Sequence, residues 1–273
     1  MTTQKGGFYF LSCAKIDILE LYMSMNESFP PASSKEVPSL DSQSKYEKVA
    51  ENIGHIAGEI SEVPVPEETI EDWRTLMRLL YKTDHALDSI ASPDEKNEKI
   101  KVFKDALHGT PKGKDVFVEE TLEEIDTLTK NFSEEEKRFF LRLLSMLLTT
   151  TEEVSKSMDA HTAAKYTLLE GQITSRLFLP FLSREFRESD QYEKFVSLIA
   201  TLGRIGNGLD TLVDLPTDYQ NGQIQTKPTL YNRAIFLGTV LTQTKSLLQD
   251  RALSKDLLKR LFLKTARAVV EDR

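Results

Sequence analysis

Two groups of aspartates stand out in this acidic chain because each repeats at the spacing of one helix turn. Asp84 and Asp88 form the first group, in RLLYKTDHALDSI. Asp210, Asp214 and Asp218 form the second, in GLDTLVDLPTD. Residues four apart on a helix share a face, about 6 Å apart along the axis. Like charges at this spacing repel each other, so an apolar helix that carries them requires water or a cation to compensate the charge.

Carboxylate oxygens without nitrogen or sulfur partners suit Mg²⁺, which keeps several waters and bridges one or two carboxylates to substrate phosphates. Two helices that face each other with these aspartates would form a clamp for a diphosphate group. The alternative is a solvated helix face, since 43 acidic residues produce such spacings by chance. The second group favours the clamp because its neighbours Leu209, Leu212, Val213 and Leu215 are apolar. The Gly-Asn-Gly stretch before Asp210 also allows close approach of a ligand.

Pro216 lies between the last two aspartates of the second group. A proline inside a helix removes a backbone donor and kinks or breaks the helix. The sequence therefore predicts an interruption that turns Asp218 away, and it favours Asp210 and Asp214 as metal ligands.

Other common chemistries find no support in the sequence. GxxxxGK[ST], GxGxxG, HExxH and GxSxG stretches are all missing. The four histidines, His55, His85, His108 and His161, do not pair at metal-ligand spacing, so we expect no zinc site. The single cysteine, Cys13, rules out an internal disulfide and fits a reducing cytoplasm. A net charge of -8 and a pI near 5.2 argue against nucleic acid as a partner.

The elements that must position the aspartates are helices. Apolar residues recur at three- and four-residue spacings in WRTLMRLLYKTDHALDSI and KRFFLRLLSMLLTT. Ser133 and Glu136 in NFSEEEKRFF have the spacing of a capping box. We find no sustained strand alternation, hairpin signal or fixed-period repeat. The sequence predicts an all-α fold of roughly eight to ten helices.

Proline, serine and glycine mark the connections between these helices. We predict loops at residues 28–44, 61–68 and 108–115. Residues 1–23 are expected to form a helix and not a signal peptide. No apolar run reaches the roughly 18 residues that span a bilayer, so we expect a cytoplasmic protein without an integral membrane segment.

We divide the chain into three parts of one domain, 1–273. Residues 1–70 hold N-terminal helices and Pro/Ser-rich loops, residues 71–228 a core with both groups of aspartates, and residues 229–273 C-terminal helices. The core therefore has to bring the two groups, about 125 residues apart in sequence, to one place.

LGRIGNGLDTLVDLPTDYQNG resembles the second aspartate-rich motif of the squalene and phytoene synthases. In that motif an Asn is followed by Asp four and eight residues later and by Gly twelve residues later. Here Asp210 takes the place of the Asn, and Asp214, Asp218 and Gly222 keep the register. KYTLLEGQITSRLF resembles a second family segment, through Gly171 and the Ser-Arg-Leu-Phe at 175–178.

The helix containing HALDSI is similar to the first aspartate-rich helix of the family, with Ala86-Leu87-Asp88 as the clearest match. The family continues with further acids, whereas this chain has Ser89, Ala91 and Ser92. Asp84, four residues before Asp88, restores the DxxxD spacing one turn earlier. The matching blocks cover about half of residues 75–228. The resemblance implies the helical bundle of the class I isoprenoid (terpene) synthases.

The resemblance also implies an activity and its site. We expect a class I terpene synthase that ionises an allylic prenyl diphosphate with Mg²⁺ and cyclises the carbocation. The alternatives are head-to-head prenyl coupling of the squalene/phytoene type and a catalytically inactive helical interaction protein. The implied metal ligands are Asp84, Asp88, Asp210, Asp214 and Asp218, of which the first four are the implied catalytic residues.

The implied substrate-binding residues combine positive charges for the diphosphate with aromatic rings for the prenyl chain. They are Arg176, Arg204, Lys165, Lys82, Tyr81, Tyr166 and Phe178, with Phe8 and Tyr9 as further aromatic candidates. The partner is a prenyl diphosphate and not a nucleic acid, while peripheral membrane association and a homodimer both stay open.

Overall fold

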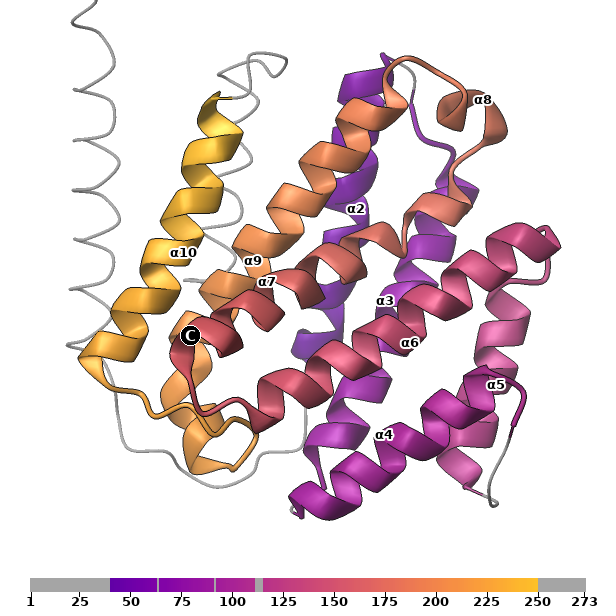
Figure 1. Ribbon diagram of the computed structural model, residues 1–273. Helices are drawn as coiled ribbons and strands as arrows, with labels where there is room; N and C mark the ends of the chain where they lie inside the picture. Colours follow the sequence, from indigo (N-terminus) through magenta and orange to yellow (C-terminus); the bar gives the residue numbers. More distant parts are fainter. Residues whose placement is uncertain (1–39, 63, 91, 111–114, 250–273) are drawn as a thin grey trace, which may run out of the picture. The chain divides into compact units, whose positions relative to one another are not determined.

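The computed structural model describes residues 40–62, 64–90, 92–110 and 115–249 (Figure 1). Contacts divide the chain into the units Met1–Val37 and Pro38–Arg273, and every described residue belongs to the second. The described residues contain nine α-helices and no strand, which confirms the all-α class. That residues 1–273 form a single domain remains a prediction. The predicted helix at 1–23, with Phe8, Tyr9 and Cys13, lies outside the described residues.

The helices follow one another along the described part of the chain with short connections. Their bounds are α2 Leu40–Ser61, α3 Glu67–Asp88, α4 Pro93–Leu107, α5 Val116–Leu128, α6 Glu134–Lys156, α7 Ala160–Arg176, η1 Leu179–Phe181 (a 3₁₀ turn), α8 Arg184–Arg187, α9 Tyr192–Gln220 and α10 Leu230–Gln249. None of the described helices combines the length and apolar character that crossing a bilayer requires.

The predicted connections at 61–68 and 108–115 are confirmed, because α2 ends at Ser61 and α4 ends at Leu107. Residues 28–39 of the loop predicted at 28–44 lie outside the described residues, and the prediction is wrong for residues 40–44, since α2 begins at Leu40. The prolines of that segment all lie at or before position 38, so nothing after them prevents a helix.

The capping box predicted before α6 is confirmed. The backbone N–H of Glu136 donates to Ser133 Oγ at 3.3 Å, and the Ser133 N–H donates to Glu136 Oε2 at 2.7 Å. Asp115 and Asp159 cap α5 and α7 in the same way, each accepting a backbone N–H three residues on. These side chains satisfy helix donors that have no partner within the helix.

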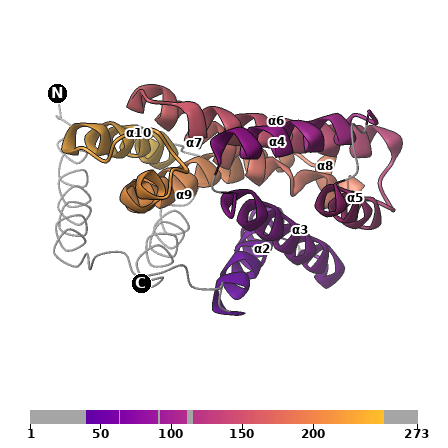
Figure 2. The same cartoon turned by 90° about the horizontal axis from the view of Figure 1, so that it is seen from below.

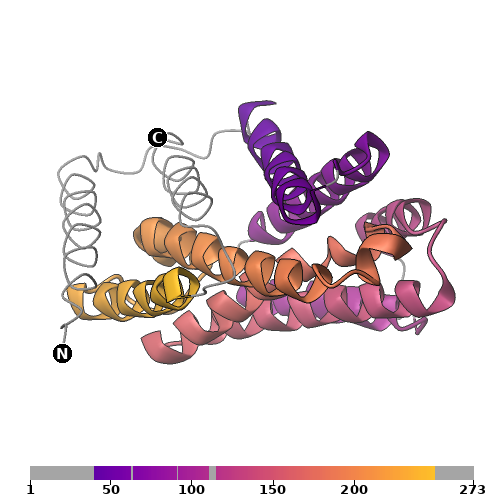
Figure 3. The ribbon, with the colours of Figure 1, turned by 90° about the horizontal axis from the view of Figure 1, so that it is seen from above.

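Helices α7 and α9 lie side by side and run antiparallel, and they share the most extensive contact among the described helices. Helix α6 packs on α7, and α10 packs on both α9 and α7. Helices α2 and α3 pair with each other and lie on one side of the row formed by α6, α7 and α9 (Figures 2 and 3).

A buried aromatic contact anchors α3, the helix that carries the first aspartates. Trp73 Nε1 donates to the Phe178 carbonyl at 3.1 Å, and the two rings meet edge to face at 5.5 Å. Both side chains are fully buried. Because Trp73 precedes Asp84 by three helix turns, this contact sets the position of Asp84 along the bundle.

Two glycines allow α7 and α9 to approach closely. A Cβ on Gly203 would lie 2.3 Å from the carbonyl oxygen of Gly171, and a Cβ on Gly171 would lie 2.2 Å from that of Gly203. One helix turn away, Asn207 Nδ2 donates to the Thr167 carbonyl at 2.8 Å. The glycine pair and this hydrogen bond fix the register of the two helices.

Gly203→Ala is expected to lower the free energy of unfolding by about 1–3 kcal/mol, because the added methyl group meets backbone that cannot move aside. Gly206→Ala is the matched control: its Cβ meets nothing within 4 Å, so helix propensity predicts a gain of about 1 kcal/mol. Urea unfolding followed by far-ultraviolet circular dichroism measures both. Equal stability of the two variants would contradict the close contact.

Candidate functional site

The fold brings the two groups of aspartates within electrostatic reach of each other. Lost hydration raises the pKa of Asp84 on α3, and the charge of Asp210 on α9 is a smaller cause that acts the same way. Lost hydration raises the pKa of Asp218 on α9 most, followed by the charges of Asp214 and of Asp88 on α3. Helices α3 and α9 are not among the pairs with extensive backbone contact, so the interaction runs between side chains.

A sixth carboxylate, which sequence reasoning missed, completes this group. Glu170 on α7 accepts from Thr151 Oγ1 at 2.5 Å and from Asn207 Nδ2 at 3.2 Å. Burial and the charge of Asp88 raise its pKa, against these two hydrogen bonds. A lone acid in the apolar stretch TLLEGQI is the signal that could have revealed it. We call the six residues the carboxylate cluster: Asp84, Asp88, Glu170, Asp210, Asp214 and Asp218.

One lysine, also missed from the sequence, supplies a positive charge to the cluster. Lys96 on α4 is buried, and its Nζ donates to Asp88 Oδ1 at 2.7 Å. Its charge lowers the pKa values of Asp84, Glu170 and Asp218, against the effect of their carboxylate neighbours. Lys96 is therefore an internal counter-ion of the cluster.

The balance still favours the protonated forms of two aspartates. Loss of hydration, followed by repulsion from Asp88 and Glu170, raises the pKa of Asp84 to about 8. Loss of hydration and repulsion from Asp214 raise that of Asp218 to about 7. Asp84 is nevertheless exposed to solvent, which reduces the share of this shift that lost hydration explains and increases the share due to repulsion from the neighbouring carboxylates.

The predicted interruption at Pro216 is wrong. Helix α9 continues through the proline to Gln220, and Asp218 interacts electrostatically with Asp214 one turn earlier. The neighbouring Leu212 and Leu215 are buried in an apolar cluster with residues of α7 and α10. We infer that this packing holds the helix together despite the lost backbone hydrogen bond.

Gly222, in the segment that resembles the second aspartate-rich motif, ends helix α9. Gly222 has a φ of +74°, in the left-handed region that favours glycine. The Gln223 N–H donates to the Asp218 carbonyl at 2.8 Å, and the Gly222 N–H donates to that of Tyr219 at 3.2 Å. This pair of bonds is a Schellman motif, so Gly222 terminates α9 just beyond the last aspartate.

A polar pocket of about 240 Å³ adjoins the cluster and shares Lys96 with it. Its other charged lining residues are Asp94 on α4 and Lys156 at the end of α6, and its amide-bearing ones are Asn97, Asn221, Gln223 and Gln225. Charges of both signs and amide groups thus meet next to the carboxylates. Hydrogen-bonding groups match this lining.

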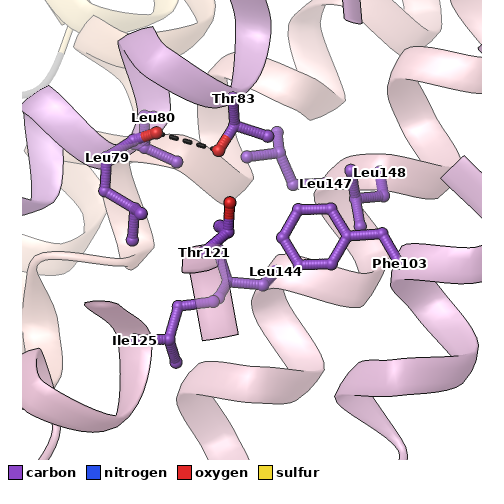
Figure 4. Close-up of a pocket in the computed structure, with 9 residues that line it drawn as sticks. All are labelled: Leu79, Leu80, Thr83, Phe103, Thr121, Ile125, Leu144, Leu147 and Leu148. Carbon is purple, nitrogen blue, oxygen red and sulfur yellow. Dashed lines mark hydrogen bonds between the residues drawn. The ribbon is translucent and has the colours of Figure 1, made fainter. Parts of the chain in front are cut away.

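A separate apolar cavity of about 30 Å³ lies between α3, α4, α5 and α6 (Figure 4). Leucines and Phe103 line it, and the hydroxyls of Thr83 and Thr121 bond to carbonyls of their own helices. A water occupies at least about 10–15 Å³ by the same kind of measure. The cavity as it stands therefore has room for small molecules only and not for a prenyl chain.

The structure gives other contacts to several of the predicted substrate-binding residues. Lys82 pairs with Glu124 on α5 at 2.6 Å, and the Tyr81 ring stacks on His85 with ring centres 6.2 Å apart. Lys165 is exposed, with its Nζ 5.9 Å from the centre of the Tyr166 ring. Phe178 lies in the core, against Trp73.

Arg176 and Arg204 come close to each other. The charge of Arg176 lowers the pKa of Arg204, after the larger effect of lost hydration. Among the described residues no carboxylate contributes to this shift. The two predicted diphosphate-binding arginines are thus grouped together, apart from the carboxylates.

The donor chemistry of the cluster fits Mg²⁺. No three His, Cys, Asp or Glu side chains in the described part of the chain are placed to hold one ion. Mg²⁺ commonly binds one or two carboxylates and completes its octahedron with water and phosphate oxygens. The five aspartates could therefore hold Mg²⁺ ions through a few direct contacts each.

The raised pKa values predict a pH-dependent stability. A carboxyl whose pKa is higher in the folded state binds more protons when folded, so the free energy of unfolding falls as pH rises through that window. For Asp84 the window runs from its ordinary 3.8 to about 8. In EDTA, Asp84→Asn should be more stable than wild type at about pH 8 and lose this advantage near pH 4.

Urea unfolding at several pH values measures this difference. Asp190→Asn, at an exposed position, is the control and should change stability equally at each pH. A difference between Asp84→Asn and wild type that does not vary with pH would contradict the repulsion within the cluster.

Comparisons with known proteins do not identify a function for this site, so its interpretation rests on its geometry. No family model, no curated protein and no solved structure matches the chain. The resemblance to the squalene and phytoene synthases thus rests on the quoted motifs alone.

Proposed function

We propose that the chain is a class I terpene synthase that acts on an allylic prenyl diphosphate. One observation carries the proposal: two helical groups of aspartates, about 125 residues apart in sequence, interact electrostatically in the fold. Such convergence of apolar helices that carry spaced carboxylates is what a diphosphate clamp requires.

The charge of the cluster supports a cationic ligand. Lys96 pairs with Asp88, and the pKa values of Asp84, Glu170 and Asp218 are raised although its positive charge lowers them. Mutual repulsion of this kind destabilises the fold unless protons or further cations compensate it. When bound here, Mg²⁺ would stabilise the charge that develops on a leaving diphosphate.

Residues of the chain would bind the ions, orient Glu170 and face the diphosphate. The aspartates of α3 and α9 would hold the ions, while Thr151 and Asn207 orient Glu170 through their hydrogen bonds. Lys96, at the wall of the polar pocket, would face the diphosphate. Water exclusion requires an apolar chamber, and the leucines of α3 and α6 would have to move to enlarge the present cavity.

Incubation with geranyl, farnesyl and geranylgeranyl diphosphates and Mg²⁺ tests the proposal. We expect release of diphosphate with a cyclic hydrocarbon or alcohol, measured by phosphate assay and gas chromatography. A doubled chain would instead indicate head-to-head coupling. Asp214→Ala should abolish turnover and leave the circular dichroism spectrum unchanged, because it removes a central ligand. Turnover close to wild type in this variant would refute the clamp.

Lys96 favours a second candidate, a helical interaction protein without catalysis. Its ammonium already pairs with Asp88, and a fixed positive charge can take over the role of a metal ion. In that case the wild type would not respond to Mg²⁺.

Thermal unfolding of Lys96→Gln with and without Mg²⁺ separates the two candidates. If Lys96 replaces the metal, the variant should melt at a lower temperature in EDTA and regain stability with Mg²⁺, while wild type stays unchanged. If the synthase proposal holds, Mg²⁺ should stabilise the wild type itself. Lys99→Gln is the control on the same helix, since Lys99 pairs with Asp115 outside the cluster.

A further inference from the structure

Two connections between helices meet beside the start of α10 (Figure 1). Thr226 Oγ1, in the connection after α9, donates to the Ser157 carbonyl, in the connection before α7, at 2.7 Å. Both residues are buried. Ile224 packs into the apolar cluster that holds Ala160 of α7 and Phe236 of α10. The two connections are therefore held against each other by a buried hydrogen bond and by apolar packing.

The three most exposed large apolar side chains among the described residues lie at this junction. Met158, the chain neighbour of Ser157, is 76% exposed. Leu230 and Tyr231, at the start of α10, are 75% and 71% exposed. We call these three residues, together with Lys227, the junction patch. Apolar area left in water is unfavourable, and a group of such side chains on one surface is typical of an interaction site.

Helix α10 continues this surface with a face that carries almost no charge. Its buried residues Phe236, Val240 and Thr244 form the inward face, and the helix packs on α9 and α7. The outward face of a helix in water normally carries charged residues. On α10 the exposed positions that follow one another by three or four residues are Leu230, Ala234, Gly238, Thr242 and Lys245.

The charge of this region is opposite to that of the chain. Residues 219–249 contain no aspartate or glutamate, although the chain has 43 acidic residues and a net charge of -8. The charged residues of this segment are Lys227, Arg233 and Lys245. Asp159, in the other connection, accepts the Thr162 N–H at 2.8 Å and so caps α7. Exposed apolar side chains and positive charge thus occur together beside the start of α10.

We propose that the junction patch docks the protein on the surface of a membrane that contains anionic lipids. Leucine and methionine side chains gain free energy when they enter the boundary between headgroups and acyl chains. Tyrosine is enriched at this depth because its ring is apolar and its hydroxyl polar. Lysine and arginine beside them are attracted by the negative surface potential.

A membrane matches this surface better than a second copy of the chain does. A two-fold dimer through the patch would place the same surface on both sides of the interface. Lys227 and Arg233 would then face a second segment without carboxylates, and like charges across an interface repel. Docking requires neither Mg²⁺ nor turnover, so the inference goes beyond the proposed function and does not depend on it.

Co-sedimentation of the full chain with phosphatidylcholine vesicles, with and without phosphatidylglycerol, tests the proposal. We expect wild type to bind the anionic vesicles more tightly than the neutral ones, and added salt to weaken this binding. The double variant Met158→Ser/Leu230→Ser should bind at least about tenfold more weakly, because two apolar side chains no longer enter the lipid. Lys227→Gln should bind anionic vesicles about fivefold more weakly, the loss that corresponds to one basic residue near the surface.

Two variants outside the patch are matched controls. Val116→Ser changes a side chain at the start of α5 that is 68% exposed, and Lys130→Gln removes an exposed positive charge after α5. Both should bind as wild type does. All the changed positions are exposed, so each variant should keep the unfolding temperature of wild type.

A gain of signal tests the orientation of the docked protein without a loss of binding. Tyr231→Trp should show fluorescence that brominated phosphatidylcholine quenches in anionic vesicles. Trp73, the tryptophan of the natural chain, is fully buried, so its own fluorescence should stay unquenched. Val116→Trp is the control and should also stay unquenched.

The proposal is overturned if wild type does not bind anionic vesicles, or if the double variant binds them as tightly as Val116→Ser. Quenching of Val116→Trp but not of Tyr231→Trp would equally reject the patch as the docking surface. A dimer in size-exclusion chromatography that the double variant abolishes, without vesicle binding by wild type, would assign the patch to a second copy instead. None of these readouts involves Mg²⁺-dependent turnover, so failure of the synthase proposal would leave them unchanged.

Discussion

The close approach of α7 and α9 at Gly171 and Gly203 is the constraint on which the carboxylate cluster and the contacts of Arg204 depend. The two backbones meet where any side chain would clash, so the register of the helices is set. Glu170 and Gln172, the neighbours of Gly171, then point away from each other around α7. Glu170 meets Asn207 and the carboxylates, whereas Gln172 meets Arg204. One contact thereby keeps the carboxylates and Arg204 on different sides of α7.

Electrostatic repulsion within the carboxylate cluster acts on the stability of the fold. At the carboxylate cluster the fold gathers like charges, and lost hydration together with this repulsion raises the pKa values of Asp84, Glu170 and Asp218. Lys96 offsets part of the repulsion in the carboxylate cluster, and two glutamine oxygens hold Arg204. A cation bound at the cluster would reduce the repulsion that remains and would stabilise the fold by the free energy of its binding.

Local features of the fold could be predicted because they depend on neighbours in sequence. The helical period of the apolar residues, the capping box at Ser133 and the connection before α3 need no knowledge of distant residues. Pro216 was misjudged for the complementary reason. Its local effect is to break a helix, but Leu212 and Leu215 are buried against α7 and α10, and that packing outweighs one lost hydrogen bond.

The candidate site shows the same division. By itself the sequence determined the all-α class and the two groups of aspartates, because both are recognised from residues that recur at intervals of three and four. Only the tertiary structure could identify Glu170 and Lys96 as members of the site. Each is a single charged residue, and its role depends on which charged side chains of other helices lie near it. The pairing of Arg176 with Arg204 was decided in the same way, by helix register. Residues far apart in sequence acquire an electrostatic role only when packing brings them together.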